Sequence, residues 1–312
     1  MQMKINREVL LKPLIKVAGI VERRHTLPIL SNLLLEAKNN TIKLTATDLE
    51  MQISLNIATE LKGGFSTTIS AKKFLDICRS LPEDIDIDLV SKDSRVMVKA
   101  GKSRFNLQTL PFADYPVMTK VAGETTKIAI SQIEFKRLLK QVEFAMAQQD
   151  IRYYLNGLLL EVNEKKLNLV GTDGHRLSFT SATLNKSYEK TDVILPRKTI
   201  IELIKLLDDT DEEISIELAT GQASFSFGEI SLISKVIDGK FPDYHRVIPT
   251  SLSNTFTANR VAMLTAMQRA SILSNEKYRG VRMVLSENNI KLISANTEQE
   301  EAEEELEITY NQ

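Results

Sequence analysis

Two stretches of the chain repeat each other: residues 30–48 read LSNLLLEAKNNTIKLTATD, and residues 155–173 read LNGLLLEVNEKKLNLVGTD. They align without a gap at an offset of 125 residues, and 8 of the 19 aligned positions are identical. Unrelated segments of this length would share roughly one position. The match indicates that one folding unit occurs at least twice along the chain.

The repeat extends outward from these stretches. PFADYP at 111–116 resembles KFPDYH at 240–245, and a weaker third copy begins near residue 253. Three complete copies would exceed the 312 residues of the chain. We therefore expect two whole domains, 1–124 and 125–250, and a third, 251–312, in which only the N-terminal half of the repeat is present.

Each unit is expected to contain a helix, alternating strands, a second helix and further strands. This order is typical of an α+β fold with helices covering antiparallel sheets. In the second unit, Ser131 and Glu134 fit a capping box at the start of the first helix. Residues 158–169 are typical of a β-hairpin whose turn is the polar segment 163–166.

The remaining helices follow from similar signals. Pro196 suits the first turn of a helix over 197–207. The first unit has equivalent helices over 7–17 and 71–80, and Pro13 should kink the first of them. Later alternating stretches predict strands in the second half of each unit.

Composition excludes several classes of protein. Hydrophobic residues make up 43% of the chain, and 40 basic residues nearly balance 41 acidic ones, so net charge alone predicts no nucleic-acid partner. The single cysteine, Cys78, excludes a disulfide framework and a cysteine-rich zinc site. His25, His175 and His245 share no metal-ligand spacing, so we expect no metal and no cofactor. No apolar stretch of about 18 residues occurs, so we expect a cytoplasmic protein without a membrane span.

Charge is separated locally even though the total cancels. The five expected helices hold 14 basic residues and 5 acidic ones. On a helical wheel, Lys12 and Lys16 lie opposite Leu10, Leu14 and Val17. Solvated helix faces would explain any single helix, but a bias shared by five helices favours a common phosphate-binding surface. The basic residues assigned to this surface are Lys12, Lys16, Lys136, Arg137, Lys140, Arg197 and Lys198.

Opposite charges also mark the two ends of the chain. Seven of the ten residues 298–307 are glutamates, whereas Lys73, Arg95, Lys102 and Arg104 belong to the first unit. Such edges can meet head-to-tail between two molecules, and a contact of that kind closes into a ring when the rotation permits.

Catalytic motifs are absent from the sequence. Asp173 and His175 resemble an acid/base pair, which leaves a hydrolase as one rival interpretation. The repeat places Asp48-Leu49-Glu50 at the same point without histidine, so a Thr-Asp turn between strands is favoured. A scaffold without a nucleic-acid role is a second rival.

Seven segments spread over the whole chain resemble the bacterial DNA polymerase III beta subunit, the sliding clamp family. They are TLPILSNLLLEA (26–37), TDLEM (47–51), AKKFLDICRSLPE (71–83), QDIRYYLNGLLLE (149–161), TDGHRL (172–177), DGKFPDYHRVIP (238–249) and SILSNEKYRGVRM (271–283). The resemblance implies tandem domains of the DNA clamp fold and a head-to-tail homodimeric ring. Helices would line a hole around duplex DNA, with sheets outside. It also implies no catalysis, sequence-independent DNA binding, and as partners the DNA polymerase III catalytic subunit, other polymerases and an ATP-dependent clamp loader.

The resemblance further assigns roles to individual residues. Family positions that touch DNA correspond to Arg24, Gln149, Tyr153 and Tyr154. The groove that binds short peptide motifs corresponds to Arg152, Leu155, Thr172, Gly174, His175, Arg176, Leu177, Pro242, Arg246 and Val247. The apolar part of the ring interface corresponds to Phe105, Leu107, Ile272 and Leu273. Its ionic part pairs Lys73, Arg95, Lys102 and Arg104 with Glu298, Glu300, Glu301, Glu303 and Glu304.

The family continues beyond the point where this chain stops. We therefore expect an unpaired sheet edge, a partly uncovered helix and an incomplete peptide groove in the third domain. A non-functional or partly folded clamp fragment is the alternative to a working clamp.

Overall fold

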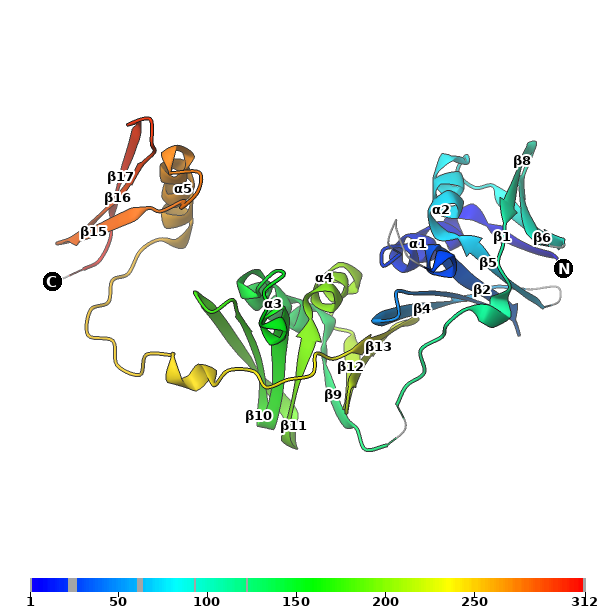
Figure 1. Cartoon of the computed structure of the whole chain (residues 1–312), viewed down its shortest axis with the longest axis horizontal. Coiled ribbons are helices and arrows are strands. Elements are labelled where there is room, and N and C mark those ends of the chain that lie inside the picture. The colour runs from blue at the N-terminus through cyan, green and yellow to red at the C-terminus, as the bar shows by residue number, and fades with distance from the viewer. Residues whose placement is uncertain (1, 22–26, 61–63, 93, 122, 311–312) are drawn as a thin grey trace. The chain divides into compact units, whose positions relative to one another are not determined.

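The computed structural model describes residues 2–21, 27–60, 64–92, 94–121 and 123–310. The chain forms two compact units, residues 1–242 and 243–312, which are described separately below (Figure 1). Among the described residues, no helix is both long and apolar enough to cross a membrane.

The first half of the first unit follows the expected order of helices and strands. Its elements are β1 (Gln2–Asn6), α1 (Arg7–Ala18), β2 (Asn32–Lys38), β3 (Thr41–Thr47), β4 (Met51–Ala58), β5 (Phe65–Ser70), α2 (Ala71–Ser80), β6 (Asp86–Lys92), β7 (Arg95–Ala100) and β8 (Ser103–Gln108). One antiparallel sheet has the order β1-β6-β7-β8, so β8 is its last strand. The helix α2 has the predicted bounds, and α1 continues through Pro13.

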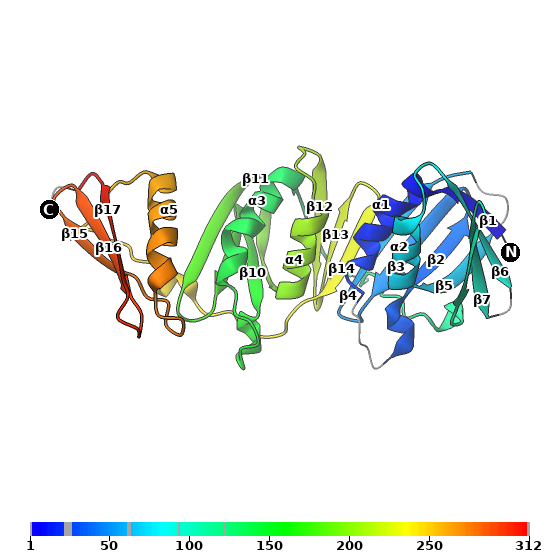
Figure 2. The same cartoon turned by 90° about the horizontal axis from the view of Figure 1, so that it is seen from above.

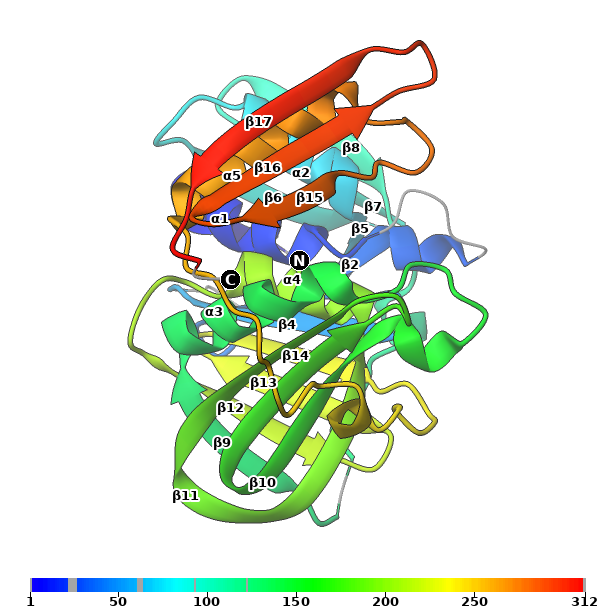
Figure 3. The ribbon, with the colours of Figure 1, turned by 90° about the vertical axis from the view of Figure 1, so that its left-hand side faces the viewer.

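The second half repeats this order. Its elements are β9 (Thr126–Ser131), α3 (Gln132–Val142), β10 (Gly157–Thr172), β11 (Leu177–Pro196), α4 (Arg197–Leu206), β12 (Glu213–Ala219), β13 (Gln222–Phe227) and β14 (Ile230–Lys235). β10 includes both strands of the predicted hairpin and pairs with β11 along its length. Both are curved, and β10 lies within the bend of β11 (Figure 3). Within β10, Glu164 has a φ of 51°, close to the 52° of Asn39 at the equivalent point of the first half.

Backbone pairing joins the two halves into one unit. Strand β4 pairs with β14 in an antiparallel register from Met51–Ser234 to Leu55–Ile230. The result is an eight-stranded sheet of order β5-β2-β3-β4-β14-β13-β12-β9. Figures 1 and 2 show α1, α2, α3 and α4 on the same side of this unit's strands. The arrangement confirms the α+β class.

The helices bury the faces that the helical wheel predicts. Leu10, Leu14 and Val17 of α1 are buried, as are Phe135 and Leu139 of α3. Burial of such side chains is worth about 1.5–3 kcal/mol each. Lys12 and Lys16 of α1 remain on the opposite face, as expected of an amphipathic helix.

Two local predictions need correction. Ser131 does precede α3, but its side chain makes no capping hydrogen bond. Carbonyls of the loop after α4 accept the first helical N–H groups instead: Gln132 N donates to Glu212 O (2.8 Å). Glu134 does not reach back, because Arg137 holds its carboxylate with two hydrogen bonds. Pro196 is the residue before α4 and not part of its first turn.

The second unit is small. It contains η5 (Tyr244–Arg246), α5 (Arg260–Ala270), η6 (Ser271–Leu273), β15 (Arg282–Ser286), β16 (Asn289–Ala295) and β17 (Glu301–Glu307). The three strands form one sheet that packs against α5 (Figure 3). Val261 and Leu264 of α5 are 55% and 48% exposed, and every residue of β15 is exposed. Apolar residues of α5 and the whole of the edge strand β15 are therefore exposed in this unit.

A glycine contact near the site provides a test of the packing in the first unit. A Cβ atom at Gly171 would lie 2.5 Å from Val142 O at the end of α3. Because Val142 O is a backbone atom and cannot rotate away from the added methyl group, we expect Gly171→Ala to lower the free energy of unfolding by about 1–3 kcal/mol in urea titrations. Gly64→Ala is the control, since its nearest atom is Ala37 O at 3.8 Å. Equal stability of the two variants would contradict this packing.

Candidate functional site

The basic residues assigned to a phosphate-binding surface lie on helices of one side of the first unit. Lys12 and Lys140 are exposed. Several of the other basic residues form ion pairs with acidic groups on other elements, which a helical wheel cannot show. Lys16 Nζ lies 3.5 Å from Asp208 Oδ2, and Lys136 Nζ lies 2.9 Å from Asp209 Oδ1.

The remaining assigned residues also have partners within the chain. Arg137 forms an ion pair with Glu134 on the same helix, at 2.7 Å. Lys198 forms an ion pair with Asp48, and the Arg197 side chain donates to the carbonyl of Glu143 at 3.2 Å. The structure thus groups these basic side chains but offers fewer uncompensated charges than the sequence predicted.

The loop after η3 (Glu143–Ala145) carries the assigned DNA contacts of the second domain. Gln149 is exposed and has a φ of 57°. Tyr153, which is 58% exposed, begins the short helix η4 (Tyr153–Leu155), and its ring meets that of Tyr154 edge-on at 6.0 Å. The equivalent contact in the first domain, Arg24, lies outside the described residues.

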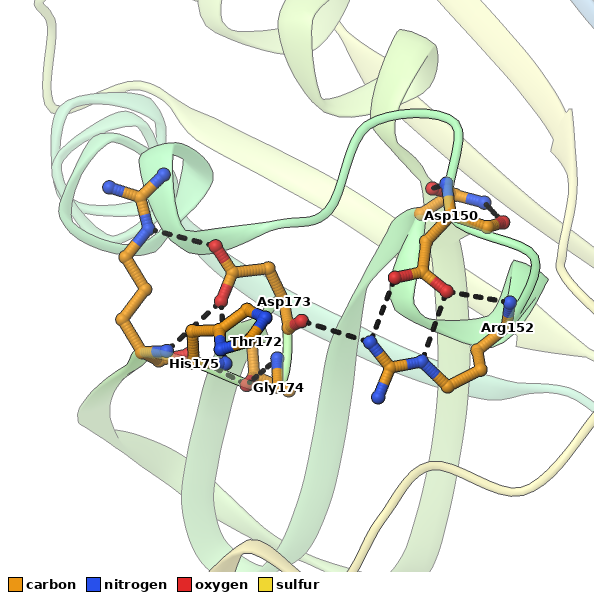
Figure 4. Close-up of polar contacts among 8 residues, drawn as sticks. Asp150, Arg152, Thr172, Asp173, Gly174 and His175 are labelled. Atoms are coloured by element: carbon orange, nitrogen blue, oxygen red, sulfur yellow. Dashed lines mark hydrogen bonds and ion pairs between the residues drawn. The ribbon is translucent and has the colours of Figure 1, made fainter. Parts of the chain in front are cut away.

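The turn between β10 and β11 is organised by Asp173 (Figure 4). Its Oδ1 accepts hydrogen bonds from the backbone N–H groups of His175 (2.9 Å) and Arg176 (3.0 Å). Thr172 Oγ1 donates to Arg176 O (2.7 Å), and Gly174 has a φ of 86°.

The first half contains the same turn. Asp48 Oδ1 accepts from the backbone N–H groups of Glu50 and Met51, and Thr47 Oγ1 donates to Met51 O. The Asp173 carboxylate is therefore a structural acceptor of a repeated turn. These hydrogen bonds lower the pKa of Asp173. A carboxyl group with a lowered pKa is unsuitable as a general acid, so the Asp/His hydrolase interpretation is not favoured.

Arg152 connects the loop to the turn. It makes two side-chain hydrogen bonds to Asp150, at 3.0 and 2.8 Å, and its Nη2 donates to Asp173 O at 3.2 Å (Figure 4). A Cβ atom at Gly174 would lie 2.9 Å from Arg152 Nη1, so glycine allows this approach. Sequence reasoning missed Asp150; the only available signal was an acid two residues before Arg152.

The assigned groove residues come from both units. In the first unit, Leu155 is buried, Leu177 is half-buried and Pro242 is exposed. Nearby, the Arg176 guanidinium lies 5.5 Å from the centre of the half-exposed Phe144 ring, a contact that the sequence did not predict. Arg246 and Val247 belong to the second unit, where both are exposed.

The assigned interface residues lie on the edge strands β8 and β17, on β7 beside β8, and on neighbouring helices and loops. On β8, the last strand of its sheet, Phe105 and Leu107 are half-buried. Exposed cations on or near this part of the first domain are Lys73, Arg95, Lys102 and Arg104. In the second unit, Ile272 is 76% exposed and Leu273 is half-buried.

The acidic part of that interface lies on or just before β17. Glu298, Glu300, Glu301 and Glu303 are exposed, and Glu304 is half-buried. Glu304 forms an ion pair with Arg269 (2.6 Å), and Glu303 forms one with Lys291 (2.7 Å). These two acids already have partners in their own unit.

No group of three or more metal-ligating acids, histidines or cysteines occurs in the described part of the chain. Cys78 is buried, and burial raises its thiol pKa to about 12. This thiol is therefore unsuited to act as a nucleophile.

The Asp150–Arg152 contact predicts a measurable titration. Hydrogen bonds from Arg152 lower the pKa of Asp150 from 3.8 to about 2. Because the folded pKa is the lower one, the contact stabilises the folded chain above about pH 4 and is lost as the pH falls toward 2. An NMR titration should place the Asp150 carboxyl near 2, and Arg152→Ala should return it toward 3.8.

Arg176→Ala is the matched control, because Arg176 pairs with Asp173. It should leave the Asp150 pKa low. An unsubstituted protein in which Asp150 titrates at its ordinary value would contradict the contact.

Three models of one family match the chain in succession. They describe the N-terminal, central and C-terminal domains of the DNA polymerase III beta subunit and cover residues 1–119, 129–243 and 245–312. Beta sliding clamps from Pseudomonas aeruginosa and Escherichia coli K12 are 46% and 43% identical to this chain. Both alignments cover 100% of this chain and 85% of the relative.

Solved structures agree with the sequence comparison. A sliding clamp (DNA polymerase III subunit beta) from Pseudomonas aeruginosa bound to griselimycin superposes with a TM-score of 0.95 at 46% identity. The Caulobacter crescentus pol III beta structure gives 0.90 at 37%. Each match covers 100% of this chain and 85% of the other. The predicted clamp fold is confirmed, and the chain belongs to the DNA polymerase III beta subunit family, the beta sliding clamps.

Proposed function

We propose that this chain is a non-catalytic clamp that encircles duplex DNA as a head-to-tail homodimeric ring. The observation that carries the proposal is the placement of four helices, with basic residues on each, on the same side of the strands of the first unit (Figures 1 and 2). In the proposed ring this side faces the DNA, with the exposed Lys12 and Lys140 among its phosphate contacts. Such contacts give position without base readout, which suits sliding.

The ring closes, in this proposal, between the first domain of one protomer and the third domain of the next. The cationic residues around β8 would face the glutamates of β17, with Phe105 and Leu107 opposite Ile272 and Leu273. Domain bounds of 1–124, 125–250 and 251–312 fit this arrangement. The exposed Ile272 supports it, because large exposed apolar side chains mark contact surfaces.

Partner proteins would dock at the turn of 172–177. We assign peptide binding to the ten groove residues, with Arg152 and Asp150 fixing the turn and Leu155 forming part of an apolar wall. The partners are the polymerase III catalytic subunit, other polymerases and an ATP-dependent clamp loader, all in the cytoplasm. Gln149, Tyr153, Tyr154 and Arg24 would contact DNA at the loops of successive domains.

Charge reversal tests DNA binding. Lys12→Glu with Lys140→Glu should weaken binding to a random-sequence duplex by at least about tenfold near 0.1 M salt, because two phosphate contacts are lost. Fluorescence anisotropy with the full chain measures this. Lys38→Glu with Lys165→Glu, which alters exposed lysines outside the helices, is the matched control. Equal affinity of the two variants would contradict the proposal.

Retention on DNA tests encirclement. Protein loaded on closed circular DNA should be retained, and linearising the circle should release it, because a ring can then slide off the ends. Loss at the same rate from both forms would exclude a ring.

Substitution of His175 tests the groove. His175→Ala should weaken binding of a short peptide with a leucine or aromatic anchor, measured by calorimetry, since His175 is exposed on the turn. Glu50→Ala, at the equivalent position of the first half, should leave peptide binding unchanged. The reverse pattern would place the groove elsewhere.

A further inference from the structure

A strongly acidic loop follows α4. Four of the five residues 208–212 are aspartate or glutamate, and Glu213 begins β12. The loop is fixed against the start of α3: Ile133 N donates to Thr210 O (3.0 Å), and Asp208 N donates to Gln132 Oε1 (3.2 Å). Its carboxylates are therefore held beside the basic helices.

The first two carboxylates of this loop reach lysines on two different helices. Asp208 pairs with Lys16 of α1, and Asp209 pairs with Lys136 of α3. The hydrogen bond from Lys136 lowers the pKa of Asp209, and the charge of Lys140 adds to the effect. Both aspartates are largely exposed, at 64% and 72% of their side chains, so water and ions can separate the pairs.

The same two lysines belong to the surface that the proposed function turns toward DNA. A phosphate oxygen and a carboxylate oxygen are both charged acceptors for an ammonium group. One lysine therefore cannot serve both fully at once. Resting on the proposed function, we propose that Asp208 and Asp209 set the strength of DNA binding by occupying Lys16 and Lys136 in competition with phosphate.

This competition has a thermodynamic signature. A lysine released from an aspartate becomes available to phosphate and adds to counterion release. Asp208→Asn with Asp209→Asn should tighten binding of the full chain to a random-sequence duplex by about 3- to 10-fold near 0.1 M salt. The slope of log K against log salt should steepen by up to about 1.8. Fluorescence anisotropy over a salt series measures both quantities.

A charge-matched control separates pairing from general repulsion. Asp211→Asn with Glu212→Gln removes the same charge from the same loop, and the structure gives neither of these described side chains an ion pair. It should change affinity and slope less. In a background of Lys16→Ala with Lys136→Ala, the aspartate substitutions should lose most of their effect, because the competing lysines are gone.

Each outcome decides the inference. Equal tightening by the two loop variants, or a full effect in the alanine background, would overturn competition for these lysines. Unchanged binding by the Asp208 and Asp209 variant, while reversal of Lys12 and Lys140 still weakens binding, would overturn the inference and leave the proposed function intact. If the lysine reversal also has no effect, the DNA-binding proposal itself fails. Thermal unfolding of each variant confirms that the fold is retained.

Discussion

Backbone hydrogen bonds between β4 and β14 are the constraint on which the first unit depends. They join one sheet from each copy of the fold into a single eight-stranded sheet, while the sheets β1-β6-β7-β8 and β10-β11 remain separate. The helices of both copies lie on the same side of the strands (Figures 1 and 2). Basic residues on the exposed faces of these helices, such as Lys12 and Lys140, therefore lie on one side of the unit, although the chain as a whole is almost neutral.

The duplicated turn shows how one local structure serves two purposes. In the first copy, Asp48 forms an ion pair with Lys198 and Glu50 forms one with Lys235, so the turn helps to join the two halves. In the second copy, the same backbone hydrogen bonds hold a turn whose His175 and Arg176 are exposed. The backbone geometry is retained, and the side chains decide whether the turn joins the two halves or leaves its residues exposed, as the proposed peptide groove requires.

Sequence periodicity correctly predicted the features that depend on residues close together in the sequence. The bounds of α2 and the buried faces of α1 and α3 follow from apolar spacing, which acts within a few turns. The capping box at Ser131 was wrong, because the N–H groups of α3 bond to carbonyls some 80 residues away in the loop after α4. The pairs of Lys16 and Lys136 with that loop were missed for the same reason: tertiary contacts leave no periodic signal.

The fold of the first unit and the charges on its helices depend on interactions of different strength. The relation between the helices depends on a continuous ladder of backbone hydrogen bonds and a buried core, which resist change together. Lys16 and Lys136 on the helices take part in exposed ion pairs, each worth little and sensitive to salt. A ring that must keep its form while its contacts with DNA are continually broken and remade needs this division. Acids placed beside basic helices are therefore consistent with a surface selected for weak contact rather than for maximum affinity.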